Sequence, residues 1–109
     1  FLDRIKMRQV IFNLIKNSCE AIDQPKGKII VSLKKTDSGI CISIEDNGCG
    51  MTHEQAENIF RPFITYKPEG TGLGLAVTAE IISAHHGQIK VSSTPGKGSV
   101  FCIYLPASS

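Results

Sequence analysis

Residues 40–51 read ICISIEDNGCGM, an alternating strand that runs directly into a glycine loop. Successive side chains of a strand point to opposite faces, so the three isoleucines share one face with Asp46. The pattern sends a carboxylate toward the apolar side of a sheet, where it needs a hydrogen-bond donor. Two interpretations stay open. Asp46 caps its own turn, as Asp-Asn-Gly sequences often do, or it accepts from a ligand such as an adenine amino group.

A helix is predicted upstream of this stretch, over residues 3–23, because apolar side chains recur there at helical spacing. Its polar face carries Asn13 and Asn17, which lie four residues apart and are therefore neighbours. A solvated helix surface is the simplest explanation. Asparagine is nevertheless a poor residue for a helix interior, and its side-chain oxygen is a suitable Mg²⁺ ligand. Both explanations stay open.

A glycine cluster lies downstream at residues 70–75, GTGLGL, and is predicted to open a helix that closes at Gly87. Free N–H groups and the helix dipole at such a terminus favour an anion, above all phosphate. A Rossmann fold needs a buried strand before the cluster and an acidic residue about 20 positions later, and neither is present. A P-loop is excluded because no Gly-Lys-Ser/Thr sequence follows. Nucleotide binding would therefore require another architecture.

The remaining elements follow from the same periodicities. Strands are expected at residues 28–34, 40–46, 88–93 and 99–105. In the first of them Ile29, Val31 and Leu33 share the apolar face, and a capping box at residues 52–55 opens a short helix that ends near Ile59. The order is helix, two strands, two helices and two strands. It predicts an α+β fold: a two-layer α/β sandwich with the helices on one face of a mixed, mainly antiparallel sheet.

Composition favours a single domain over residues 1–109, because 41% of the residues are hydrophobic and the formal net charge is only +2. The small charge and the lack of a Lys/Arg cluster in the sequence exclude a nucleic-acid partner. The longest apolar stretch, residues 73–82, is far shorter than the roughly 20 residues of a membrane span. Four cysteines without framework or metal-ligand spacing favour reduced thiols. We expect a cytoplasmic domain, and membrane anchoring of the parent protein stays open.

These features, in this order, resemble the N, G1 and G2 boxes of the Bergerat-type ATP-binding fold shared by histidine kinases, type II topoisomerases, a chaperone family and mismatch-repair proteins. The chain is most similar to the catalytic domain of a bacterial sensor histidine kinase. Residues 9–17, 46–51 and 70–75 carry the three boxes, residues 60–63 fit the F box, and residues 86–106 are similar to the closing strands. Such domains normally begin with a strand before the first helix, so an edge strand is expected to be missing here.

The resemblance implies an ATP and Mg²⁺ site. Asn17 would be the Mg²⁺ ligand, Asn13 would support the phosphates and Asp46 would bind adenine. Lys67 would contact the phosphates, so that Asn13 and Lys67 are the expected catalytic residues. The other residues expected around the nucleotide are Gly48, Gly50, Met51, Phe63, Gly70, Thr71, Gly72, Leu73, Gly74 and Leu75. Phe63 is also expected, together with Phe60, to anchor the lid loop.

In the ATP-hydrolysing relatives a glutamate occupies the position of Asn13 and acts as a general base for water. An amide cannot accept that proton, so the resemblance implies transfer of the γ-phosphoryl group to a histidine rather than efficient hydrolysis. The acceptor would lie on a separate dimerisation hairpin, which would also present the phosphate to a response regulator. None of His53, His85 and His86 lies in an acceptor motif. This chain is expected to be a monomer and the parent protein a homodimer.

Two alternatives remain: a serine-phosphorylating kinase of the anti-sigma-factor type, and a non-catalytic module that senses ATP. The N box and the lid are also similar to those of sporulation-type kinases. This similarity does not identify a pathway. Cys49 lies inside the presumed adenine loop, and ATP would shield its thiol if the side chain faced the base. We expect no special reactivity at this cysteine.

Overall fold

The computed structural model describes residues 3–22, 25–61 and 74–106. Its elements, in chain order, are α1 Arg4–Ala21, β1 Ile29–Thr36, β2 Gly39–Asp46, α2 His53–Asn58, α3 Gly74–Ala84, β3 Gln88–Thr94 and β4 Gly98–Pro106. The predicted order of elements is confirmed. Most boundaries differ from the predicted ones by one or two residues, and the end of α3 differs more.

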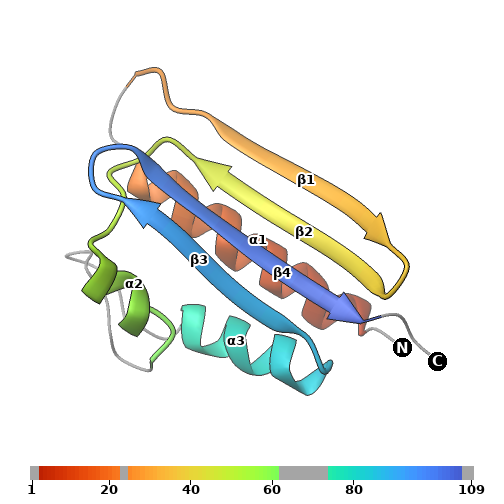
Figure 1. Cartoon of the computed structure of the whole chain (residues 1–109). Coiled ribbons are helices and arrows are strands. Elements are labelled where there is room, and N and C mark those ends of the chain that lie inside the picture. The colour runs from red at the N-terminus through yellow and green to blue at the C-terminus, as the bar shows by residue number, and fades with distance from the viewer. Residues whose placement is uncertain (1–2, 23–24, 62–73, 107–109) are drawn as a thin grey trace.

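The four strands form one sheet in the order β1-β2-β4-β3, and all three neighbouring pairs are antiparallel. Figure 1 shows α1 and α3 together on one face of this sheet. The predicted two-layer α/β sandwich is therefore confirmed. The register sets Ile44 opposite Phe101 and Ile40 opposite Leu105, which gives the sheet one apolar face beneath the helices.

The core lies between this apolar face and the two long helices. From α1 it receives Val10 and Leu14, both fully buried, and from α3 it receives Ile81 and Ile82. The strands contribute four further buried side chains, Ile44, Phe101, Ile103 and Leu105. Each such side chain stabilises the fold by about 1.5–3 kcal/mol. The core thus fixes α1 and α3 relative to the end of β2, where Asp46 lies.

Strand β1 departs from the predicted burial. Val31 pairs with the buried Ile44 and therefore has the core parity, yet Val31 is 50% exposed and Leu33 67% exposed. The reason is tertiary: β1 is an edge strand, and α1 lies behind β2 and β4 rather than over β1 (Figure 1). Within the described residues no strand pairs with the outer edge of β1. The missing edge strand stays a prediction.

The end of α3 differs from the predicted one, because the helix ends at Ala84 and not at Gly87. The N–H of His86 donates to the Ser83 carbonyl and the N–H of Gly87 donates to the Ile82 carbonyl, both at 2.9 Å. This is the Schellman pattern, in which the left-handed residue is His86, with φ of 61°. Gly87 serves another purpose: a Cβ atom there would collide with the Tyr104 carbonyl oxygen of β4.

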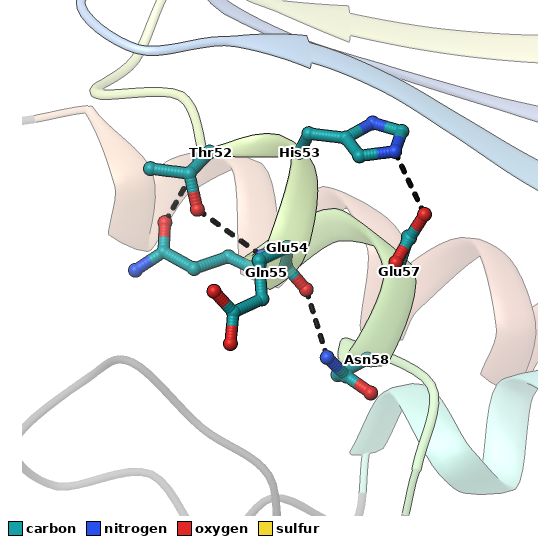
Figure 2. A network of polar contacts seen from close by, with 6 residues as sticks. All are labelled: Thr52, His53, Glu54, Gln55, Glu57 and Asn58. Atoms are coloured by element: carbon teal, nitrogen blue, oxygen red, sulfur yellow. Dashed lines mark hydrogen bonds and ion pairs between the residues drawn. The ribbon is translucent and has the colours of Figure 1, made fainter.

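The short helix α2 begins with the predicted capping box, shown in Figure 2. The Gln55 N–H donates to Thr52 Oγ1 at 3.1 Å, and the Thr52 N–H donates to Gln55 Oε1 at 2.9 Å. His53 Nε2 lies 2.7 Å from Oε1 of Glu57, which is one turn further along α2. Both side chains are largely exposed, so this pair contributes little to stability.

Candidate functional site

Asp46, the last residue of β2, is 4% exposed, so its predicted parity is confirmed. Its Oδ1 accepts a hydrogen bond from the Gly48 N–H at 2.8 Å, which is the turn-capping role. Its Oδ2 is buried and has no hydrogen-bond partner among the described residues. Turn capping therefore uses only one of the two oxygens. The other still needs a donor, and a ligand amino group is one that would satisfy it.

Asp46 belongs to a row of polar residues that crosses the sheet at one end of the apolar core. The register sets Asp46 opposite Ser99 on β4, and Ser99 opposite Ser93 on β3. The Ser93 hydroxyl lies 2.9 Å from the Gly98 carbonyl and 2.8 Å from Ser99 Oγ, and it accepts from the Met51 N–H at 2.7 Å. The two serines were not predicted. The sequence could have indicated Ser99, because this residue has the same strand parity as the buried side chains on β4.

The glycines of the loop after Asp46 have a structural role of their own. A Cβ atom on Gly48 would lie 2.6 Å from the Ala21 carbonyl oxygen, and the Cys49 N–H donates to that same oxygen at 2.9 Å. Gly50 has φ of 71° and its missing Cβ would collide with the Thr94 carbonyl. Both glycines therefore let the loop pack against the last turn of α1 and the β3–β4 turn. The Cys49 residue is exposed.

Asn13 and Asn17 are half-buried on α1. The Asn13 side chain is not a simple solvated surface group, because its Nδ2 lies 3.3 Å from both the Gly74 carbonyl oxygen and Thr78 Oγ1. It thereby joins α1 to the first turn of α3. The Asn17 side chain makes no hydrogen bond within the described part of the chain. Its amide oxygen is available to a ligand on the same helix face.

Gly74 is the first residue of α3, and a Cβ atom at this position would meet nothing within 4 Å among the described residues. Its φ is not among the positive values. The described protein therefore gives no steric reason for glycine, whereas a ligand close to the helix terminus would. Leu75, the next residue, is half-buried and packs against the core. Among the described residues, the start of α3 is thus open on one side and anchored on the other.

Several expected nucleotide-binding residues lie outside the described residues, namely Phe63, Lys67, Gly70, Thr71, Gly72 and Leu73. Phe60, just before this segment, packs edge-on against Phe101, with ring centroids 6.0 Å apart and an interplanar angle of 82°. This contact fixes Phe60 to the sheet, and its role in anchoring the lid stays a prediction. Met51 is half-buried and also packs against the core.

The two ends of the candidate site, at the loop after Asp46 and at Asn13, both lie along α1. The loop after Asp46 contacts Ala21 at the end of α1, while Asn13, eight residues earlier, contacts the start of α3. At 1.5 Å per residue these points are about 12 Å apart, a span that a nucleoside triphosphate can bridge. No group of three His, Cys, Asp or Glu side chains in the described ranges could hold a metal. None of the described helices is long and apolar enough to span a membrane.

The family model for histidine kinase-, DNA gyrase B-, and HSP90-like ATPases matches residues 2–109. The chain is 46% identical over 105 residues to sporulation kinase B of Bacillus subtilis (strain 168), a match covering 96% of this chain and 24% of that protein. It is 48% identical over 105 residues to the signal transduction histidine-protein kinase AtoS of Escherichia coli (strain K12), covering 95% and 17%. The chain thus spans about a quarter or less of the length of these relatives.

Solved structures give the same result. The catalytic domain of the histidine kinase ThkA superimposes with a TM-score of 0.84 at 34% identity, covering 96% of this chain and 68% of that one. The mycobacterial sensor histidine kinase MprB gives a TM-score of 0.85 at 27% identity, covering 95% and 72%. Sequence and fold agree with each other, and the chain belongs to the histidine kinase-, DNA gyrase B- and HSP90-like ATPase family.

Proposed function

We propose that this chain binds ATP with Mg²⁺ and donates the γ-phosphoryl group to a histidine on a separate dimerisation hairpin, as the catalytic domain of a sensor histidine kinase. The observation that carries the proposal is the Asp46 carboxylate, which is buried and has one oxygen without a partner among the described residues. A buried charge of this kind requires a donor. The adenine amino group supplies one, and a hydrogen bond to a charged acceptor is worth about 1.5–3 kcal/mol.

The phosphate end of the site is built from two helices. The described part of α3 begins at Gly74, where a Cβ atom would meet no described residue, and a helix N-terminus attracts phosphate through its N–H groups. Asn17 would offer its amide oxygen to Mg²⁺, an ion that takes one or two protein oxygens and completes its shell with water and phosphate. When bound, Mg²⁺ neutralises negative charge on the phosphates. We propose that Lys67, Gly70 and Gly72, which lie outside the described residues, also contact the phosphates.

The chemistry of Asn13 favours phosphoryl transfer over hydrolysis. Its amide nitrogen lies against the Gly74 carbonyl and Thr78, and an amide has no basic atom to accept a proton from water. The described residues therefore hold a nucleotide without activating water at this position. Such a site depends on an incoming nucleophile placed by another segment.

Two of the described histidines, His53 and His85, are poor acceptor candidates because their rings are already engaged. His53 lies beside Glu57, and the His85 ring is held between the Ile81 carbonyl and the Asp3 N–H. The relatives are several times longer than this chain, which leaves room for a hairpin that carries the acceptor. We propose that this hairpin also dimerises the parent protein and passes the phosphate to a response regulator. The present chain alone would be a monomer.

Calorimetric titration with a non-hydrolysable ATP analogue, with and without Mg²⁺, tests nucleotide binding. Asp46→Ala should lower the affinity by about ten- to a hundredfold. Glu45→Ala is the matched control, because Glu45 is the adjacent carboxylate, has the opposite strand parity and is exposed. Asn17→Ala should chiefly remove the Mg²⁺ dependence. A folded wild-type chain that does not bind the analogue would refute the proposed function.

Transfer is tested with γ-labelled ATP and the polypeptide that contains the acceptor hairpin. Phosphohistidine is labile in acid, whereas phosphoserine is stable, so the acid lability of the label separates the histidine kinase from a serine kinase. Nucleotide binding without any labelled product would favour an ATP-sensing module instead.

A further inference from the structure

Thr78 is a hydroxyl residue with no exposed surface, placed one turn inside α3. Its Oγ1 donates to the Gly74 carbonyl oxygen at 2.9 Å and accepts from Asn13 Nδ2 at 3.3 Å. Asn13 Nδ2 lies at the same distance, 3.3 Å, from the Gly74 carbonyl oxygen. The three groups form a closed triangle between α1 and α3.

This triangle decides which way the Asn13 amide points. The Gly74 carbonyl oxygen can only accept hydrogen bonds, so the amide atom that faces it must be the nitrogen. With its own proton given to Gly74, the Thr78 hydroxyl can only accept from Asn13. Both acceptors of α3 lie on the same side of the amide nitrogen, since they are only 2.9 Å apart. The Asn13 oxygen, Oδ1, therefore points away from them and is left for a ligand.

The orientation has a chemical consequence for the metal end of the site. A phosphate oxygen needs donors, and the Asn13 amide nitrogen faces α3 instead. An amide oxygen suits a cation or a water molecule bound to a cation. Asn17, one turn later on the same face of α1, provides a second such oxygen.

We propose that Thr78 is a positioning residue that holds the Asn13 amide with its oxygen toward Mg²⁺ and the water molecules around it. Asn13 then acts through the cation and not on the phosphates directly, which changes the role expected for it from the family resemblance. This inference rests on the proposed Mg²⁺–ATP function. It gives the Thr78 hydroxyl a role beyond bonding back to its own helix, as threonine side chains in helices often do.

Three variants of this chain test the inference. Thr78→Val keeps the shape of the side chain and removes the hydroxyl, whereas Thr78→Ser keeps the hydroxyl. Thr36→Val is the control, because the Thr36 hydroxyl donates to the Gly39 carbonyl in the turn between β1 and β2. The affinity for a non-hydrolysable ATP analogue is measured over a range of Mg²⁺ concentrations and again with EDTA.

We expect Thr78→Val to raise the Mg²⁺ concentration for half-maximal binding by about three- to tenfold, the effect of one hydrogen bond. The affinity in EDTA should not change, Thr78→Ser should restore the wild-type value, and Thr36→Val should match the wild type. If Thr78→Val does not fold, as judged by circular dichroism, Thr78→Ala serves the same comparison.

Two results overturn the inference while leaving the proposed function intact. One is an equal loss of affinity with Mg²⁺ and in EDTA, which shows a merely structural role. The other is an unchanged Mg²⁺ requirement in Thr78→Val. A folded wild-type chain that binds no nucleotide refutes the proposed function, and the inference falls with it.

Discussion

The backbone N–H of Asp3 donates a hydrogen bond to Nε2 of His85 at 3.1 Å, although the two residues are 82 positions apart in the sequence. Nδ1 of the same ring lies 2.8 Å from the Ile81 carbonyl oxygen. A backbone N–H can only donate, so Nε2 is the acceptor in the first contact, which leaves Nδ1 to donate to the Ile81 carbonyl. Asp3 also caps α1 by accepting from the Ile5 and Lys6 N–H groups. One imidazole therefore fastens the start of α1 to the end of α3.

His85→Ala removes both of these hydrogen bonds, and we expect the free energy of unfolding to fall by about 1–2 kcal/mol. Urea denaturation followed by circular dichroism measures this change. His53→Ala is the control, because the His53 side chain is 90% exposed and should contribute almost nothing. Equal stability of the two variants would show that the link between the helices carries no free energy.

The two residues after α3 should respond to substitution in opposite directions. His86→Gly relieves a left-handed backbone at a non-glycine residue and should stabilise the chain by about 0.5–1 kcal/mol. Gly87→Ala places a Cβ against the Tyr104 carbonyl and should destabilise it by about 1–3 kcal/mol. Thermal unfolding of both variants tests the assignment. The opposite ranking would mean that Gly87, not His86, is the left-handed cap.

Gly74→Ala tests whether glycine at this position is required by the fold or by a ligand. The described residues leave room for the extra methyl group, so the stability should stay the same or rise by up to about 1 kcal/mol. The affinity for an ATP analogue should fall, because the methyl group would occupy space beside the phosphates. Ser83→Ala, an exposed change on the same helix, should leave the affinity unchanged. Unaltered binding by Gly74→Ala would place the phosphates elsewhere.

Asp46→Asn tests base selection more finely than removal of the side chain. The amide oxygen can still accept from the Gly48 N–H, so the turn should survive. The amide nitrogen would then face the adenine amino group, donor against donor, while it could donate to the O6 atom of guanine. We expect the preference for ATP over GTP to shrink by about tenfold or more. Competition between the two nucleotides provides the measurement, and an unchanged preference would remove Asp46 from the base site.

Cys49 should be alkylated at the same rate with and without ATP, because the residue is exposed while its backbone N–H is bonded to Ala21. Mass spectrometry after brief treatment with iodoacetamide can follow this reaction. Cys19, also exposed, serves as the internal reference. Protection of Cys49 alone would show that its thiol faces the bound nucleotide.

Local periodicity was enough to predict the burial of Asp46 and the shared helix face of Asn13 and Asn17. Strand parity and helix spacing depend only on neighbours in the sequence. The bond from Asn13 to Thr78 could not be predicted in this way, because the two residues are 65 positions apart. A hint was present in the sequence: Thr78 is a polar residue in an otherwise apolar stretch of α3.

Two departures from prediction have tertiary causes. Gly87 was expected to end α3 because glycine favours left-handed backbone, but the structure uses its small size for contact with β4. The alternation of β1 correctly predicted which side chains share a face. It could not predict that α1 would leave Val31 and Leu33 exposed, since coverage depends on where a distant helix lies.

The outer edge of β1, with which no described strand pairs, also bears on how copies of this chain meet. An uncovered edge offers unpaired backbone groups to any other strand and invites aggregation, which lysine side chains on edge strands counteract. Lys34 and Lys35 are consecutive residues of β1, so their ammonium groups project to opposite faces of the sheet. Two copies that approached edge to edge would bring these charges together. Electrostatic repulsion would thus oppose edge-to-edge association at β1, the strand whose apolar side chains are most exposed.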